Sequence, residues 1–469
     1  MATPKGLQYS GCVAADELED VGAGFLGWLD SKDLVIAMTW SQMAIAKKNT
    51  LVMQLRWKNH GDYKPLMIRV GSSDSYEENV TSMEWLMFDD FTVLAVGTSS
   101  GALRIYTTQG VLLFQQQFSS GPVLRIRARQ DGNIVVGHTA SEDVCLVFPK
   151  AIARVDVVDL HTVISKYQAR NDRVSRRLGE LTRSDSLNLR LPYEMWSVGK
   201  SSASSYIADG ALACVMAPPL LEHQLKRHYC ALTVGEDCTL AAFRVSGEKR
   251  GSLTGLVMDK VMPAAMSTIT HLTKRFWKSD PTSEANRPTE VAPQAFGRAT
   301  LITTLRDKNR KGVSLALSSS GSLAAVTDSL GRISLIDVQA LVVVRLWKGY
   351  REAHCVFLEA PEDGRPEYEM IQSKRRRRFS RDDFKLCLAI HAPRRGVVEV
   401  WEMRYGPRLI IVKCAEGCRL LQPSCKFSFS NDFSSESADD DEYIPAQVYM
   451  LQGNAGLLQL LNPYARSSW

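Results

Sequence analysis

A short pattern of polar and apolar positions recurs along the chain. It opens with two small or polar residues, usually has Gly or Asp at or near the third position, and continues with alternating apolar positions. Ten-residue windows with this pattern begin at residues 40, 99, 141, 236, 329, 394 and 454. In SLGRISLIDV, at 329–338, a small turn leads into a strand whose side chains alternate between its two faces. The pattern therefore predicts a repeated turn and strand.

The segments around each window complete a meander. A short apolar run precedes each window, and a further strand often follows, as VVVRLWKGY does at 342–350. Gly101, Gly331 and Gly396 stand where a tight hairpin turn needs a positive φ, which glycine adopts at little cost. Seven meanders predict an all-β, seven-bladed β-propeller with WD-like blades, because radial repetition leaves only short, protected sheet edges.

Two stacked β-sandwiches are the alternative architecture for these strands. Their Greek-key connections do not require the recurring turn and strand, so the propeller is favoured. We expect an N-terminal tail at 1–24 and a single propeller domain at 25–469. A plain blade takes about 40–45 residues, and most windows are spaced more widely. This excess predicts helical and disordered loop insertions near 151–200, 253–295, 360–384 and 425–444.

Two insertions are predicted to contain amphipathic helices. VISKYQARNDRVSRRLGELTR, at 163–183, is expected to pack on a propeller face or to contact a partner or an anionic surface. The segment 253–280 is apolar in its middle and then continues with Lys274, Arg275, Phe276 and Trp277. It either covers a groove of the same protein or contacts a partner or a membrane interface, with these four residues as the membrane contact.

The remaining insertions contain charged runs. KRRRR, at 374–378, is expected in a solvated loop, with nuclear targeting or a polybasic membrane contact as alternatives. SNDFSSESADDDE, at 430–442, has the composition of a disordered acidic loop. The net charge of +6 is mild, and these runs make it uneven. The background outside them is even, which argues against a nucleic-acid surface, because such a surface needs a coherent basic stripe.

The composition is typical of a soluble globular protein. Hydrophobic residues make up 45% of the chain, yet no apolar run is long enough for a transmembrane helix, and the N-terminus has no apolar signal region. Ten scattered cysteines fit the reduced, buried thiols of a cytosolic protein. We therefore expect a cytoplasmic location, with peripheral attachment to endomembranes if an amphipathic segment contacts lipid.

No enzyme motif occurs in the sequence. A P-loop, a dinucleotide-binding fingerprint, a zinc-protease motif and a serine-nucleophile elbow are absent. Cys414, Cys418 and Cys425 are the closest group of cysteines, but their spacing is not the paired C-x₂-C of a zinc site, and no histidine lies between or directly after them. We predict no catalytic residue, no cofactor and no metal site. An interaction platform is favoured over an enzyme that uses the propeller channel.

Several stretches resemble one known family. The phrases LWKGYR, at 346–351, and APRRG, at 392–396, are the most specific of them. The longer matching stretches lie, in order, at 25–38, 97–129, 323–353 and 388–421. The chain resembles the N-terminal region of the non-catalytic, regulatory subunit of the Rab-three GTPase-activating complex.

This resemblance implies an all-β domain in a subunit that pairs with a separate catalytic subunit. The family's complex stimulates GTP hydrolysis on Rab-three, is associated with nucleotide exchange on Rab-eighteen, and works in membrane traffic, on lipid droplets and in autophagy. The arginine that stabilises the transition-state charge belongs to the catalytic subunit, so the resemblance assigns that role to no arginine here. Family members continue into a long helical region, whereas this sequence ends at Trp469. Functions of that region are therefore not assigned to this chain.

The predicted function is a non-enzymatic regulatory scaffold that binds the catalytic subunit, a Rab GTPase, or both. The two specific phrases supply the candidate partner contacts, which are Trp347, Lys348, Tyr350, Arg351, Arg394 and Arg395. The sequence leaves open whether these residues contact a partner or stabilise the blades, and two of them, Trp347 and Tyr350, are also explained as core aromatics. The alternative function is a membrane-surface adaptor that acts through 253–280 in autophagy or lipid-droplet biology.

Overall fold

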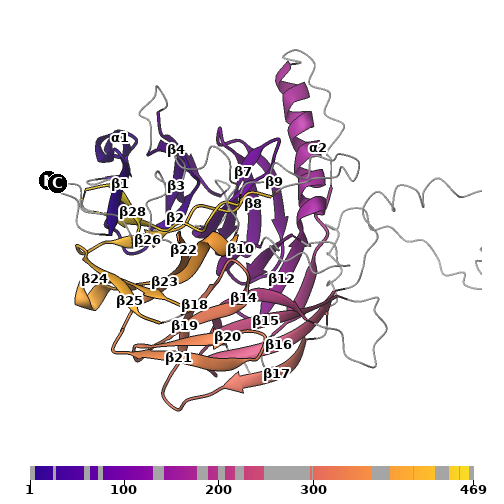
Figure 1. The fold of residues 1–469 in the computed structure, drawn as a ribbon. Helices are drawn as coiled ribbons and strands as arrows, with labels where there is room; N and C mark the ends of the chain where they lie inside the picture. The colour runs from indigo at the N-terminus through magenta and orange to yellow at the C-terminus, as the bar shows by residue number, and fades with distance from the viewer. Residues whose placement is uncertain are drawn as a thin grey trace, which may run out of the picture.

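A computed structural model shows how the strands are arranged (Figure 1). It describes residues 6–24, 28–57, 64–71, 78–129, 142–176, 189–198, 206–216, 227–247, 296–297, 299–361, 381–404, 406–427, 443–453 and 455–463. Within these ranges the strands form seven antiparallel sheets of four strands each. The predicted helix at 253–280, with Lys274, Arg275, Phe276 and Trp277, lies outside the described residues, as do the charged runs at 374–378 and 430–442.

Each sheet is one blade, and the first four blades follow one another along the chain. Blade 1 consists of β2 (Val35–Met38), β3 (Gln42–Lys47), β4 (Thr50–Arg56) and β5 (Leu66–Arg69). Blade 2 consists of β6 (Val80–Met87), β7 (Thr92–Thr98), β8 (Ala102–Thr107) and β9 (Leu112–Gln117). Blade 3 consists of β10 (Arg125–Arg129), β11 (Asp143–Val147), β12 (Ala151–Asp156) and β13 (Glu194–Ser197). Blade 4 consists of β14 (Ile207–Met216), β15 (Arg227–Gly235), β16 (Leu240–Gly247) and β17 (Ala299–Leu305).

Three further blades complete the set. Blade 5 consists of β18 (Gly312–Leu317), β19 (Leu323–Asp328), β20 (Arg332–Asp337) and β21 (Val342–Lys348). Blade 6 consists of β22 (His354–Pro361), β23 (Phe384–Ala392), β24 (Val397–Glu402) and β25 (Arg408–Lys413). Blade 7 consists of β26 (Arg419–Leu421), β27 (Tyr449–Gln452), β28 (Leu457–Leu461) and β1 (Leu7–Cys12).

The first strand of each blade lies nearest the axis of the ring. β2 contacts β6, β6 contacts β10, and the contacts continue through β14, β18, β22 and β26 back to β2. This closed series of contacts makes the fold a seven-bladed β-propeller, which confirms the fold class predicted from the repeated pattern. The fourth strand of each blade is the outer edge of its sheet.

The hydrophobic core lies between neighbouring blades rather than at one centre. In β3, Met43 and Ile45 belong to a buried cluster that also contains Tyr449 of blade 7. The alternate residue Ala44 belongs to a different cluster, which contains Trp85 of blade 2. Because successive side chains of a strand point to opposite faces, one strand packs against two blades. This is why the inner strands are apolar at consecutive positions.

The last blade is built from both ends of the chain. β1 pairs antiparallel with β28, and Leu7 lies opposite Leu461 in the ladder. The prediction of an N-terminal tail at 1–24 is therefore wrong for residues 7–12, which form the outer strand of blade 7. The strand segment LQYSGC has no hairpin turn to mark it, because its partner lies at the other end of the sequence.

The seven windows fall in seven different blades but not always on the same strand. Five of them fall on the third strand, whereas the windows at 40–49 and 141–150 fall on the second strands β3 and β11. In blade 1 the hairpin between β3 and β4 turns through Lys48, which is not glycine but adopts a φ of 54°. The glycine-based pattern therefore misses that turn. The apolar run at 133–139, expected before the third window, lies outside the described residues.

One predicted insertion helix is present with different bounds. α2 (Val157–Arg176) starts directly after β12, where the Asp156 carboxylate accepts a hydrogen bond of 3.0 Å from the Val158 backbone N–H. Its buried residues Val163 and Ile164 join the core cluster of blades 2 and 3, so this part of the helix packs on the propeller. In the insertion predicted near 151–200, β12 and β13 belong to blade 3 and α2 lies between them.

The remaining described helices are short. They are α1 (Ala15–Asp20) and the 3-10 helices η3 (Arg381–Asp383) and η4 (Pro393–Arg395). Within the described part of the chain, no helix has the length and apolar character needed to cross a bilayer.

A test of the predicted hairpin turn is available at Gly331. Its φ is 84°, and an added Cβ would lie 2.8 Å from the backbone nitrogen of Arg351. We expect Gly331→Ala to lower the free energy of unfolding by about 1–3 kcal/mol, measured by urea denaturation. Gly349→Ala is the matched control, because Gly349 has a φ of 85° but no atom within 4 Å of an added Cβ. Equal losses for the two variants would contradict the close contact at Gly331.

Candidate partner-binding site

The two specific phrases, LWKGYR and APRRG, meet at the junction of blades 5 and 6. The first spans the end of β21 and the turn after it, and the second spans η4 and its flanking residues. The guanidinium of Arg395 lies 4.6 Å from the ring centroid of Tyr350. Arg394 forms an ion pair with Glu352, just beyond the first phrase. Segments that are distant in sequence are thus in direct contact.

A buried carboxylate connects the aromatic residues of the two blades. The Tyr350 hydroxyl donates a hydrogen bond of 2.7 Å to Glu399, and the Trp401 indole N–H donates one of 3.0 Å to the same carboxylate. Burial, followed by the hydrogen bond to Glu399 and its negative charge, raises the pKa of Tyr350 above its ordinary value. Tyr350 therefore stays protonated and continues to donate to Glu399 at neutral pH.

Trp347 packs in the same junction. Its ring meets the ring of Trp401 edge-on at 6.0 Å, and the guanidinium of Arg345 lies 4.6 Å and 4.8 Å from the two ring centroids. Such cation–π contacts contribute about 0.5–2 kcal/mol each. Trp347 is 5% exposed and Tyr350 is 7% exposed. Both are core aromatics of the blade junction, which was one of the two interpretations left open by the sequence.

The charged residues of the two phrases lie at the surface above these aromatics. Lys348, Arg351, Arg394 and Arg395 are the basic members; the first two are exposed, and the side chains of Arg394 and Arg395 are 56% and 48% exposed. We call these four residues the basic rim. Their exposed position leaves them accessible to a partner, and the contact itself stays a prediction.

An exposed apolar edge lies beside the basic rim, and sequence reasoning missed it. In β21, Val342, Val343, Val344 and Leu346 are 40–53% exposed. We call these four residues the blade 5 edge. Within the described chain, β21 has a strand partner on one side alone, namely β20. The run VVVRLW is the sequence signal that could have revealed this edge, because apolar residues at consecutive positions are typical of a strand covered on both faces.

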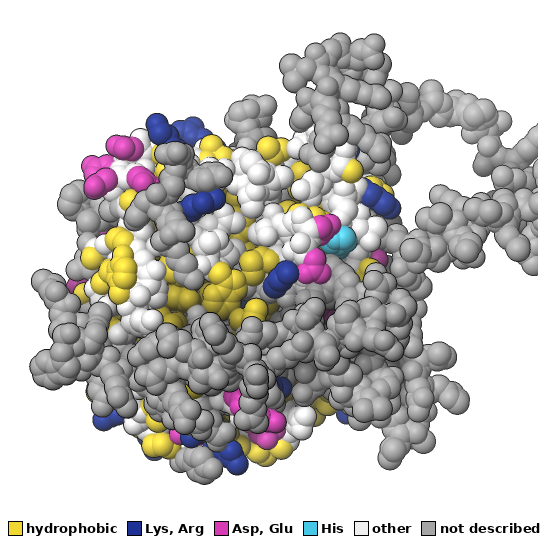
Figure 2. Space-filling model, turned by 45° about the horizontal axis from the view of Figure 1, so that its top comes forward, with side chains coloured by type: hydrophobic (Ala, Val, Ile, Leu, Met, Phe, Trp, Pro, Cys, Tyr) yellow, Lys and Arg dark blue, Asp and Glu magenta, His cyan; other side chains and the backbone are white. Residues whose placement is uncertain are grey.

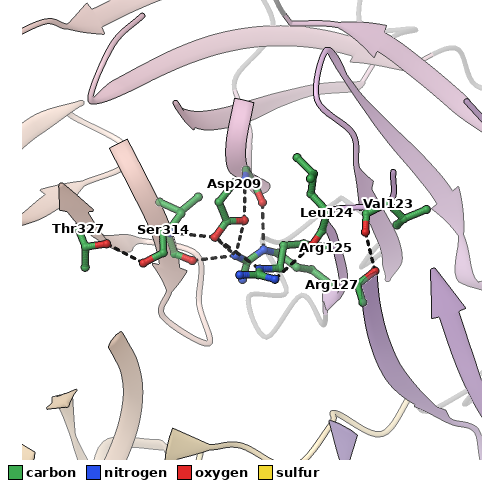
Figure 3. A network of polar contacts seen from close by, with 10 residues as sticks. Val123, Leu124, Arg125, Arg127, Asp209, Ser314 and Thr327 are labelled. Atoms are coloured by element: carbon green, nitrogen blue, oxygen red, sulfur yellow. Dashed lines mark hydrogen bonds and ion pairs between the residues drawn. The ribbon is translucent and has the colours of Figure 1, made fainter. Parts of the chain in front are cut away.

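A polar network near the propeller axis joins three blades (Figure 3). Arg127 on β10 donates hydrogen bonds of 2.9 Å to both carboxylate oxygens of Asp209 on β14, and one of 2.7 Å to the carbonyl of Leu315 on β18. The Leu315 N–H in turn donates to Asp209 at 2.9 Å. Since these contacts occupy the carboxylate of Asp209, the network is suited to holding the ring together rather than to acid–base chemistry.

Two other groups among the described residues have the chemistry of a site. Burial raises the pKa of Glu84 on β6 to about 7, against the opposing effect of a hydrogen bond from Ser424. His391, Cys414 and Cys418 lie close enough together to bind a metal ion.

On the face shown in Figure 2, hydrophobic side chains gather near the middle, and basic side chains are interspersed with acidic and uncharged ones.

Comparison with protein families identifies the chain's relatives. The family model described as "Rab3 GTPase-activating protein regulatory subunit N-terminus" matches residues 28–421. The chain belongs to this family. The match includes both LWKGYR and APRRG, so the resemblance inferred from these phrases is confirmed.

A curated relative and two solved structures are also similar. The Rab3 GTPase-activating protein regulatory subunit of Caenorhabditis elegans is 23% identical over 385 residues, which cover 78% of this chain and 26% of the relative. The chain thus spans about a quarter of the length of that relative. The WD40 β-propeller domain of Doa1 has a TM-score of 0.43 and 10% identity, covering 97% of each chain. A chain of the mitotic checkpoint complex has a TM-score of 0.41 and 11% identity, covering 99% of this chain and 96% of that one.

Proposed function

We propose that this propeller is the non-enzymatic docking unit of a Rab GTPase regulator and that the blade 5 edge binds the catalytic subunit. The observation that carries the proposal is the row of four exposed apolar side chains on β21. An exposed, apolar edge strand is prone to uncontrolled pairing unless another chain covers it. Membership of a regulatory-subunit family supports the catalytic subunit as the partner that covers it.

The edge offers two kinds of contact to that partner. Its unpaired backbone groups can extend the sheet by one strand of the catalytic subunit, and its apolar side chains supply buried area. β17, the outer strand of the neighbouring blade, also has exposed apolar residues, namely Leu301, Ile302 and Leu305. A strand with apolar side chains on its contact face is therefore the expected element of the partner.

The basic rim gives the surface a charge preference. Lys348 ends β21, and Arg351, Arg394 and Arg395 lie at the same junction of blades 5 and 6. These four residues favour acidic residues in the partner near the added strand. Complementary charges at the rim of an interface mainly increase the association rate and fix the register. In this proposal the chain contributes no catalytic group; the complex works in the cytoplasm, peripherally on endomembranes, and the partner supplies the chemistry of GTP hydrolysis.

The test is a double substitution on the blade 5 edge. Val342→Glu together with Val344→Glu places two carboxylates where apolar contacts are expected, and we expect binding of the catalytic subunit to weaken about 100-fold or more, because loss of central interface contacts costs about 2 kcal/mol or more each. Binding is measured by titration of the purified catalytic subunit. Leu112→Glu is the matched control, since Leu112 is 43% exposed on β9, the outer strand of blade 2.

Circular dichroism and thermal unfolding establish that both variants are folded. Wild-type affinity in the folded double variant would overturn the assignment of the edge. Loss of Rab binding with unchanged binding of the catalytic subunit would also overturn it, because the edge would then belong to the GTPase. The predicted membrane contact rests on residues 274–277, outside the described residues, and stays a prediction.

A further inference from the structure

Three side chains with metal-binding chemistry converge between blades 6 and 7. His391 lies near the end of β23, Cys414 directly follows β25, and Cys418 directly precedes β26. One ligand atom from each lies within 4.8 Å of the other two. In a tetrahedral zinc site, Zn–S bonds of about 2.3 Å and Zn–N bonds of about 2.0 Å place ligand atoms roughly 3.5–4 Å apart. The three side chains therefore need only a small contraction to surround an ion.

The backbone holds each ligand in place independently of any ion. The Cys414 N–H donates a hydrogen bond of 2.9 Å to the carbonyl of Gly396, which directly precedes β24. The Cys418 N–H donates to the carbonyl of Ala415 at 3.3 Å, which closes the turn between the two cysteines. His391 pairs with Val398 in the ladder of β23 and β24. Because the ligands sit on ordered backbone, binding would cost little conformational entropy.

The donor set selects the class of metal. Two thiolates and a neutral imidazole balance the charge of a divalent cation, and sulfur with nitrogen favours zinc over magnesium or calcium. His391 and Cys418 are buried, whereas Cys414 is half-buried. We propose that His391, Cys414 and Cys418 bind a zinc ion, and that water reaches the fourth position from the side of Cys414.

The expected consequence is a link between two blades. His391 belongs to the second strand of blade 6, while Cys418 precedes the first strand of blade 7. An ion bound by both would tie the sheet of blade 6 to the connection that leads into blade 7. An ion that binds the folded chain but not the unfolded chain raises the free energy of unfolding. At ion concentrations above Kd, this gain grows with the logarithm of the ion concentration.

The test measures metal content and coordination in the intact chain. We expect protein purified with zinc and without chelator to contain about one zinc ion per chain by plasma mass spectrometry. His391→Ala and Cys414→Ser are each expected to lower this content at least about fivefold, because each removes one of three protein ligands. Cys425→Ser is the matched control, since Cys425 is a free thiol outside the cluster, and it is expected to retain the zinc.

A second measurement covers the case in which a variant folds poorly. Cobalt added to the metal-free wild type is expected to give the visible absorption of tetrahedral coordination and the near-ultraviolet band of thiolate ligation, and zinc is expected to displace it. Retention of zinc by the Cys414→Ser variant would overturn the proposal. So would a wild-type chain that takes up neither metal, or one whose mass is lower by the two hydrogens of a Cys414–Cys418 disulfide.

Discussion

Deletion of residues 1–12 is expected to lower the free energy of unfolding by on the order of 5 kcal/mol or more. The deletion removes β1, the outer strand of blade 7, together with the buried side chain of Leu7 and the ladder that it forms with β28. Loss of one buried leucine costs about 2–5 kcal/mol, and the lost ladder adds to this. The edge of β28 becomes unpaired as well, which favours aggregation.

Urea denaturation followed by circular dichroism measures the effect. Deletion of residues 1–5 is the matched control, because it shortens the same end of the chain without removing any residue of β1. A peptide of residues 1–14 added to the longer deletion is expected to restore part of the lost stability. If the two deletions are equally stable, β1 does not contribute to the stability of blade 7.

Arg127→Ala is expected to destabilise the propeller by about 3–5 kcal/mol, since it removes the close ion-pair partner of a buried charge. The remaining carboxylate is that of Asp209, whose side chain is 2% exposed. The substitution removes the hydrogen bonds from one guanidinium to both oxygens of Asp209 and to the carbonyl of Leu315. The inner strand of blade 3 thereby loses these polar contacts with blades 4 and 5, whereas the hydrogen bond from the Leu315 N–H to Asp209 remains.

Arg125→Ala provides the comparison on the same strand. Its guanidinium lies 3.9 Å from Asp209 and its side chain is 50% exposed, so a loss of about 0–1 kcal/mol is expected. The losses in the free energy of unfolding of both variants are to be measured by denaturant unfolding at the same pH and ionic strength. A loss at Arg127 no greater than that at Arg125 would mean that the network adds nothing to the ring.

The sequence predicted the blades because their defining features are local. The turn at Gly331 and the alternating strand after it lie within ten residues, so one window contains both. The strand at 7–12 was missed because its partner, β28, is at the opposite end of the chain. In blade 1 the turn at Lys48 carries a positive φ on a residue type that gives no signal for it.

The candidate site was predictable in its residues but not in their arrangement. LWKGYR and APRRG were singled out separately, and their contact through Tyr350 and Arg395 depends on how blades 5 and 6 pack. The exposure of Val344 depends on the place of β21 at the outer edge, which the apolar run VVVRLW alone does not reveal. His391 was separated from the two cysteines by other strands, so spacing rules for metal sites did not apply.

Blade 7 combines β1 with β26, β27 and β28, which lie far from it in the sequence, and this has a consequence for how the chain folds during synthesis. β1 ends at Cys12 and is synthesised well before its partner β28, which begins at Leu457. At about 5–20 residues per second, translation of the intervening chain takes on the order of tens of seconds. During that time six blades can form while the first strand of the chain has no partner. Nascent chains are therefore expected to depend on chaperones that shield this segment until β28 has been synthesised.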